Sequence, residues 1–352
     1  MTTRLTRLIL ALALATALTL PVAGLRAAWE LHQVNGRDHV TLDNIQDFYR
    51  FDSRSVSNRQ IRLASRRRSI IVKLNSRELH INGIKFLLSY PVVERNGKVL
   101  VSRMDLSKLI EPVLRPSRIA GAERVRTVVL DPGHGGHDSG ARGAWGREKD
   151  FNLDVARRAR AILMRKGYNV VMTRNDDRFI PLQQRADFAN RHRDALFVSI
   201  HFNSSRNRAA RGIETFVLAP RGVPSFAQDG PRVSDFRLCR GNARDAENMA
   251  LATAMHASML RRLKVPDRGI KRARFLVIRE VEIPGVLLEG GFLSNNQDSR
   301  LVASKSYRQQ MAYSIVEAIA NYRKAVASGT SASRQTKTVR NDAAPTVVTT
   351  PN

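Results

Sequence analysis

Two histidines and two glutamates occupy positions from which the chain could build a metal-dependent hydrolytic site. His134 follows a short apolar run in the string LDPGHGG, and His201 ends a second, strongly apolar run. Glu289 ends a third apolar run, and Glu148 stands just ahead of an amphipathic stretch. Two histidines and one carboxylate form a common catalytic zinc set, in which the fourth position holds a water whose pKa falls to about 7. A second carboxylate nearby can take the proton of that water and pass it to a leaving amine.

The four residues can meet only if the elements that carry them share one edge of a sheet. Hydrophobic periodicity predicts strands at 127–131, 168–173, 195–201, 212–218, 275–278 and 285–289. It predicts helices at 151–166, 182–191, 245–263 and 307–322. This alternation indicates an α/β fold with a mostly parallel sheet layered between helices. Because ligands bind at the carboxyl ends of the strands in such folds, His134, His201 and Glu289 are expected at that edge.

Each of these residues also has a purely structural interpretation. The string around His134 begins as an ordinary Asp-Pro-Gly turn, a histidine that ends a strand is more often packed in the core, and Glu148 suits the first turn of a helix. Glu289 is harder to dismiss, because a carboxylate that ends an apolar strand is costly unless it is paired, solvated or bound. All four residues fall at one end of the predicted sheet. We therefore interpret His134, Glu148 and His201 as metal ligands and Glu289 as the base.

The N-terminal segment 1–27 has the layout of a secretory signal peptide. Arg4 and Arg7 precede an apolar run at 8–20, and small residues follow Pro21. This run is too short for a comfortable membrane span, which needs about 20 residues. An uncleaved membrane anchor is the alternative interpretation. Either one places the rest of the chain outside the cytoplasm, with the periplasm as the expected compartment and secretion as the alternative.

Composition and turn signals divide the rest of the chain. Residues 28–116 contain short β-like runs and turn signals such as Asn-Gly at 82–83 and 96–97, and are expected to form a small α+β domain. A polar linker at 117–126 precedes a catalytic domain at 127–324, which contains a Gly- and Pro-bearing insert at 219–241. The tail at 325–352 is rich in Ser, Thr and Ala and is expected to be disordered.

The composition restricts the partners. The formal net charge of +28 favours polyanionic surroundings, although Arg-rich codon usage on solvated faces explains it equally well. No RNA-binding signature or zinc finger accompanies the charge, so nucleic acid is not an expected partner. The single cysteine, Cys239, excludes an intramolecular disulfide. Core packing or a metal must therefore stabilise the fold.

The stretch 127–292 closely resembles the catalytic domain of zinc-dependent N-acetylmuramoyl-L-alanine amidases. The blocks of that family are matched, in order, by VVLDPGHGGHDSGA, EKDFNLDVA, SIHFN, RGIETFVL and LLEGGFLSN. The resemblance implies a phosphorylase/hydrolase-like sheet and one Zn²⁺ per chain. It implies that His134, Glu148 and His201 bind the zinc and that Glu289 is the catalytic carboxylate.

The same resemblance implies a function and further residues. It implies hydrolysis of the amide bond between the muramic acid lactyl group and L-alanine in peptidoglycan, for cell-wall remodelling or daughter-cell separation. Asn203 and Arg268 fall on recurrent family positions, which implies supporting roles near the substrate or behind the ligands. Anionic envelope polymers and a protein activator are further candidate partners. A non-catalytic or partner-regulated zinc-containing wall-binding protein is the alternative.

Three regions depart from that family or extend beyond its catalytic domain. Phe202 replaces a small residue of the family and is expected to narrow the cleft. The insert 219–241 contains Asp229 and Asp235 but no glutamate that could cap the zinc, as a helix does in some inactive relatives, so partial cover at most is expected. The front segment, which includes RELHINGIKFLLSYPVVERNGKVLVSRMDLSKLIEPVLRP, resembles the small N-terminal module of copper amine oxidases. That resemblance implies an α+β fold and no copper site.

Overall fold

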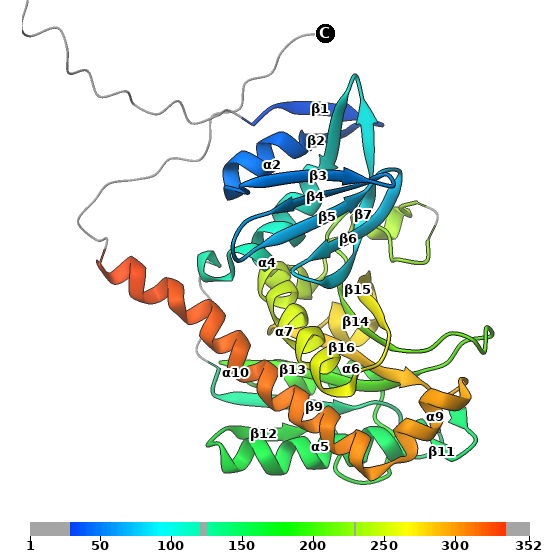
Figure 1. Cartoon of the computed structure of the whole chain (residues 1–352). Helices are drawn as coiled ribbons and strands as arrows, with labels where there is room; N and C mark the ends of the chain where they lie inside the picture. The colour runs from blue at the N-terminus through cyan, green and yellow to red at the C-terminus, as the bar shows by residue number, and fades with distance from the viewer. Residues whose placement is uncertain (1–28, 120–124, 229, 336–352) are drawn as a thin grey trace, which may run out of the picture.

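A mostly parallel sheet forms the centre of the structure, a computed structural model that describes residues 29–119, 125–228 and 230–335 (Figure 1). Six of its strands run in the order β12, β9, β13, β16, β14, β15. Neighbours are parallel except for β14 and β16, which are antiparallel. The strands span Thr127–Pro132 (β9), Asn169–Met172 (β12), Ala195–Asn203 (β13), Ile213–Leu218 (β14), Asp267–Ala273 (β15) and Gly285–Phe292 (β16). The α/β fold predicted from the sequence is confirmed.

Helices cover both faces of this sheet (Figure 1). Along β9, Val128 and Leu130 pack into the core under α5, α7 and α10, whereas Val129 packs into a second core under α6 and α8. This alternation is why both faces of the strand are apolar. None of the described helices is long and apolar enough to cross a membrane. The helices span Glu148–Arg165 (α5), Leu182–Asn190 (α6), Asp245–Leu263 (α7), Leu276–Arg279 (α8), Asn296–Ala303 (α9) and Lys305–Gln335 (α10).

The front segment adds strands to the same sheet. Strand β7 pairs with β15 through Phe86 and Ile270, and the Lys85 backbone N–H donates to Asp267 Oδ2 at 3.0 Å. Beyond β7 the sheet continues through β6, β5 and β4 to β3 at its edge. The front strands are Leu31–Val34 (β1), Arg37–Thr41 (β2), Ser53–Ser57 (β3), Gln60–Ala64 (β4), Ser69–Lys73 (β5), Ser76–Ile81 (β6), Ile84–Arg95 (β7) and Lys98–Ser102 (β8). The front helices are Leu42–Tyr49 (α2), Arg103–Asp105 (α3), Leu106–Ile110 (η1), Glu111–Leu114 (α4) and Pro116–Arg118 (η2).

Two expectations about local structure are wrong. Residues 276–278 of the predicted strand at 275–278 belong to the short helix α8. The strand at the far side of β14 from β16 is β15, which has three cationic side chains among its seven residues. The two arginines and the lysine of β15 interrupt the hydrophobic pattern by which a strand is predicted, although Arg272 is buried. Helix α10 continues through Gln335, so the part of the predicted disordered tail at 325–335 is helical. The predicted signal peptide 1–27, half of the linker (120–124) and the end of the tail (336–352) lie outside the described residues.

A buried ion pair closes the end of β9. Asp131 Oδ1 lies 2.8 Å from Arg185 Nη1 of α6, and each residue is 1 % exposed. The Asp131 carboxylate also accepts hydrogen bonds from Thr173 Oγ1 at 2.6 Å and from Ser199 Oγ at 2.8 Å. Burial favours the neutral carboxyl, but Arg185 and the two hydroxyls outweigh it and hold the pKa of Asp131 below its usual range. The pair therefore joins β9, β13 and α6 at the edge where the predicted ligands lie.

Removing the negative charge of this pair should destabilise the fold. Asp131→Asn leaves Arg185 buried without a counter-ion and should lower the unfolding free energy by about 3 kcal/mol in urea titrations at pH 7. The exposed Asp187→Asn on the same helix is the control and should change it by less than about 0.5 kcal/mol.

The effect should also depend on pH. A carboxyl whose pKa is depressed in the folded state stabilises the protein above its unfolded pKa of about 3.9 and loses that contribution as the pH falls through the folded pKa. The difference between wild type and Asp131→Asn should therefore shrink below about pH 4. An unchanged difference down to the acid unfolding limit would contradict the assignment.

Candidate metal centre and active site

The loop after β9 presents His134 in an uncommon backbone conformation. Its φ of 61° lies in the left-handed region, which non-glycine residues rarely adopt. Gly135 follows with a φ of 128°, and a Cβ on it would lie 2.1 Å from the Arg178 carbonyl oxygen. Glycine at this position lets the loop reverse against the segment before α6.

Two buried arginines hold the backbone of this loop. Arg174 donates from Nε to the Pro132 carbonyl at 2.9 Å and from Nη2 to the Gly133 carbonyl at 2.7 Å. Arg185 donates from Nη2 to the carbonyl of His134 at 2.7 Å. Burial, together with the positive charge of Arg185, lowers the pKa of Arg174 to about 10. The histidine is thus positioned by charge-assisted hydrogen bonds to its own backbone and its neighbours.

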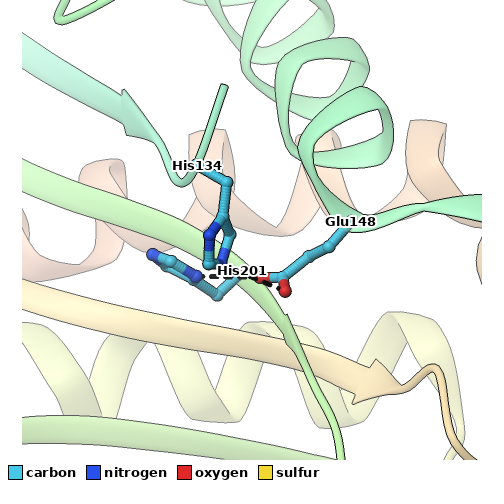
Figure 2. Close-up of side chains that lie close together, drawn as sticks. All are labelled: His134, Glu148 and His201. Atoms are coloured by element: carbon cyan, nitrogen blue, oxygen red, sulfur yellow. Dashed lines mark hydrogen bonds and ion pairs between the residues drawn. The ribbon is translucent and has the colours of Figure 1, made fainter. Parts of the chain in front are cut away.

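His134, Glu148 and His201 meet at the edge of the sheet, as expected (Figure 2). They come from the loop after β9, the first residue of α5 and the carboxyl end of β13. Glu148 Oε2 lies 3.1 Å from His134 Nε2, and Glu148 Oε1 lies 2.8 Å from His201 Nδ1. One nitrogen or oxygen from each residue lies within 4.8 Å of the other two.

Hydrogen bonds from the surroundings orient these three side chains. The Ala141 backbone N–H donates to Glu148 Oε2 at 2.8 Å, and the Phe202 N–H donates to Oε1 at 3.2 Å. His134 Nδ1 lies 2.8 Å from Asp138 Oδ2, so Nε2 is the histidine atom left to face Glu148. Burial favours neutral Glu148, but the hydrogen bonds to the two histidines outweigh it and hold the pKa of the Glu148 carboxyl well below its usual range.

The donor set has the chemistry of a zinc site. Two imidazole nitrogens and one carboxylate oxygen are the ligands that catalytic zinc takes, with a fourth position left open. The hydrogen bond from His134 to Asp138 is the kind of contact that orients a metal-binding histidine through its other ring nitrogen. Gly140 packs closely against the ligands, since a Cβ on it would lie 2.5 Å from Glu148 Oε2. The residues therefore fit a zinc ion.

Glu289 lies beside this set on β16. It is opposite His201 on β13 and opposite Glu214 on β14. Its Oε2 is buried and has no hydrogen-bond partner among the described residues. Burial raises the pKa of the Glu289 carboxyl well above its usual range, and the negative charges of Glu148 and Glu214 raise it further, against the opposing effect of Lys271. A carboxyl with these properties can hold a proton next to the candidate metal site.

A polar cluster behind Glu289 was only partly predicted. Glu214 is 3 % exposed and accepts hydrogen bonds from Asn203 Nδ2 at 3.0 Å and from Arg268 Nε at 2.8 Å, and it also pairs with Lys271 Nζ. Asn203 and Arg268 are expected from the sequence, whereas Glu214 and Lys271 are not. The signal for Glu214 was present, since it is a carboxylate within an apolar strand, as Glu289 is.

Other sequence expectations have mixed outcomes. Phe202 is 1 % exposed and lies 6.2 Å from the Phe151 ring, so the expectation that it narrows the cleft is wrong. Strand alternation explains this, because His201 and Asn203 face the site while Phe202 points to the opposite side of β13. His137, which had no assigned role, is exposed and stacks on Phe179 with ring centroids 4.3 Å apart.

The insert at 219–241 packs against the front segment. Tyr90 donates to the Gly222 carbonyl at 3.0 Å, and Asp235 forms an ion pair with Arg274 at 2.8 Å. Two short 3₁₀ helices begin within the insert: Val233–Phe236 (η3) and Arg240–Arg244 (η4). In the described part of the insert, no residue forms a hydrogen bond or ion pair with the three candidate ligands or Glu289.

Comparison with known proteins identifies similar sequences. The chain is 33% identical over 243 residues to N-acetylmuramoyl-L-alanine amidase AmiC of Escherichia coli O6:H1, covering 62% of this chain and 58% of AmiC. It is 31% identical over 219 residues to AmiA of Escherichia coli K12, covering 56% of this chain and 76% of AmiA. The chain thus spans little more than half of the length of AmiC.

Solved structures and a family model match as well. The catalytic domain of CwlV, an N-acetylmuramoyl-L-alanine amidase from Bacillus (Paenibacillus) polymyxa var. colistinus, is 33% identical, with a TM-score of 0.48 over 57% of this chain and 99% of that domain. The model of the N-acetylmuramoyl-L-alanine amidase family matches residues 128–321. Because this match covers more than half of the 352 residues, the chain belongs to the N-acetylmuramoyl-L-alanine amidase family.

Proposed function

We propose that this chain is a zinc-dependent peptidoglycan hydrolase that cleaves the amide bond between the lactyl group of muramic acid and L-alanine of the stem peptide. The observation that carries the proposal is the convergence of His134, Glu148 and His201 beside the buried carboxyl of Glu289. Membership of the amidase family supplies the class of bond. The products are a glycan strand with free lactyl carboxylates and a stem peptide with a free amine.

The proposed ligands of one Zn²⁺ are His134 Nε2, His201 and the Glu148 carboxylate. When bound there, zinc would act as a Lewis acid and would lower the pKa of a bound water to about 7. The two histidines hold the pKa of the Glu148 carboxyl below its usual range, so the carboxylate is in the ionised form that a metal ligand requires. Asp138 keeps Nε2 of His134 directed at the site by accepting from Nδ1.

Glu289 has the proposed role of proton carrier. Its buried oxygen without a partner is free to accept a proton from the attacking water and to donate it to the leaving alanine nitrogen. Amide cleavage needs this transfer because the amine is a poor leaving group unless it is protonated. Asn203 and Arg268 bond the two oxygens of Glu214, and with it they form the wall next to Glu289. We propose that they position the substrate or this wall.

The biological setting follows from the sequence. We propose secretion through the segment 1–27 into the periplasm, a front domain at 28–116, a linker at 117–126 and a catalytic domain at 127–324. The pairing of β7 with β15, through Phe86 and Ile270, joins the front segment to the sheet of the catalytic segment. Peptidoglycan is the proposed partner, in wall remodelling or daughter-cell separation. Anionic envelope polymers and a protein activator are proposed as further partners.

The first prediction concerns Glu289. Purified peptidoglycan incubated with the zinc-loaded chain should release stem peptides with a free L-alanine amine, detected by mass spectrometry. Glu289→Gln keeps the shape but cannot carry the proton, so its rate should fall by about 10²- to 10⁴-fold while bound zinc remains.

The outcomes separate amidase action from its alternatives. Release of fragments cut within the peptide would contradict the bond assignment. Zinc binding without release by either protein would favour a regulated or non-catalytic wall-binding protein. Equal rates of the two proteins would remove Glu289 from the mechanism.

The second prediction concerns Asp138. Asp138→Ala removes the acceptor that orients His134 and should weaken zinc affinity by about 10- to 100-fold in competition with a chromogenic chelator. Asp138→Asn should lose less, because its amide oxygen can still accept the hydrogen bond. Asp187→Asn, an exposed residue of α6, is the control and should bind zinc as the wild type does. Unchanged affinity of Asp138→Ala would show that His134 is not a ligand or does not depend on this contact.

A further inference from the structure

A short hairpin carries an exposed tryptophan directly before Glu148. Strands β10, Arg142–Gly143, and β11, Gly146–Arg147, pair in antiparallel register, and Ala144 and Trp145 form the tip. Trp145 is 48 % exposed. Two residues, Gly146 and Arg147, separate it from Glu148, so the two Cα atoms can lie no more than roughly 11 Å apart. The tip of the hairpin is therefore close to a candidate metal ligand.

The hairpin is fixed to the site and to the catalytic sheet. Glu148 N–H donates to the Ala141 carbonyl at 2.9 Å, and the Ala141 N–H donates back to the Glu148 carboxylate at 2.8 Å. A Cβ on Gly143 would lie 2.4 Å from Ser299 Oγ of α9, which places the hairpin against that helix (Figure 1). A Cβ on Gly146 would lie 2.5 Å from the Phe151 ring. This close packing makes the tip a rigid support.

The surroundings of the indole are cationic. The guanidinium carbon of Arg300, an exposed residue of α9, lies 5.8 Å from the centroid of the Trp145 ring. Arg142 and Arg147 flank the tip and are both exposed, although Arg147 is paired with Asp150 at 2.8 Å. A single exposed apolar residue needs no explanation, but a rigid indole between arginines, three positions before a candidate metal ligand, has the composition of a binding platform.

We propose that Trp145 stacks on a sugar ring of the glycan strand and that Arg300 and Arg142 attract its carboxylates. An indole face is flat and apolar, and it matches the C–H face of a pyranose ring, whose hydroxyls point outward to water. Hydrolysis of the lactyl amide creates one carboxylate on each muramic residue, so the cationic rim favours the glycan side of the cleaved bond. The inference rests on the proposed function, since it assigns the glycan end of that substrate.

Binding to a ligand that cannot be cleaved tests the platform independently of amidase activity. Peptide-free glycan strands with free lactyl carboxylates contain no scissile amide. The chain has two tryptophans, and Trp29, which is partly buried with its ring 5.0 Å from Phe48, can be replaced in Trp29→Phe. In the zinc-loaded full chain with this change, Trp145 is the sole tryptophan. Titration with glycan strands should then shift its emission to shorter wavelength and saturate.

Variants identify the contact. Trp145→Ala in the otherwise wild-type chain should weaken glycan affinity by about tenfold in sedimentation assays, whereas Trp145→Phe should keep it within about threefold. Tyr313→Ala is the matched control, because Tyr313 is also an exposed aromatic next to an arginine, with Arg262 5.5 Å from its ring, but it lies on α10. It should bind glycan as the wild type does. Unchanged zinc content and circular dichroism would show that each variant is folded.

The results decide the proposal in either direction. Saturating binding without an emission change, equal affinity of Trp145→Ala and wild type, or no binding of glycan strands would each overturn it. If the chain also digests peptidoglycan, Trp145→Ala should raise KM with little change in kcat, as loss of substrate binding distant from the reacting atoms requires. Failure of digestion with intact glycan binding would count against the proposed function and leave the platform supported.

Discussion

The site depends on one constraint: His134 must be held in a left-handed backbone conformation at the end of β9. A residue with a side chain resists that conformation, so the surrounding structure has to enforce it. Asp131 anchors Arg185 inside the fold, and Arg185 in turn binds the carbonyl of His134. Arg174 binds the two carbonyls that precede it. The buried ion pair thus holds this loop in addition to its contribution to the stability of the fold.

Three glutamate side chains lie near one another at the same edge of the sheet. Glu148, Glu214 and Glu289 come from different elements and are close enough for the first two to raise the pKa of the third. Glu214 is neutralised by Arg268 and Lys271, and Glu148 is bonded by two histidines. Glu289 has no such partner among the described residues. A cation held by the histidines and Glu148 would compensate this charge, which is the electrostatic reason why a metal suits the arrangement.

The sequence alone was sufficient for the residues that end apolar strands. His201 and Glu289 follow strong hydrophobic runs, and the rule that strand ends gather at one edge brought them together with His134. Strand β15 could not be predicted in the same way. Arginine and lysine are typical surface residues, so the sequence gives no sign that Arg272 is buried or that Lys271 is partly buried. Lys271 pairs with Glu214 of the neighbouring strand β14, a contact that the sequence alone does not reveal.

Long-range pairing explains the other gaps. The contact between β7 and β15 joins residues far apart in the chain, and no local pattern records it. The direction of the Phe202 side chain follows from strand alternation, but only once His201 is known to face the site. Glu214 could be noticed as a carboxylate in an apolar strand, but placing it opposite Glu289 required the antiparallel pairing of β14 with β16. What was missed is therefore the arrangement between elements, while the elements themselves were mostly found.

The central claim is that His134, Glu148 and His201 together hold the metal. Anomalous diffraction from crystals of the zinc-loaded chain, recorded on both sides of the zinc absorption edge, tests it directly. The account predicts one peak per chain at about 2.0–2.1 Å from a nitrogen of each histidine and about 2.0–2.2 Å from a Glu148 oxygen. A peak at other residues, or none at this edge of the sheet in protein shown to contain zinc, would contradict it.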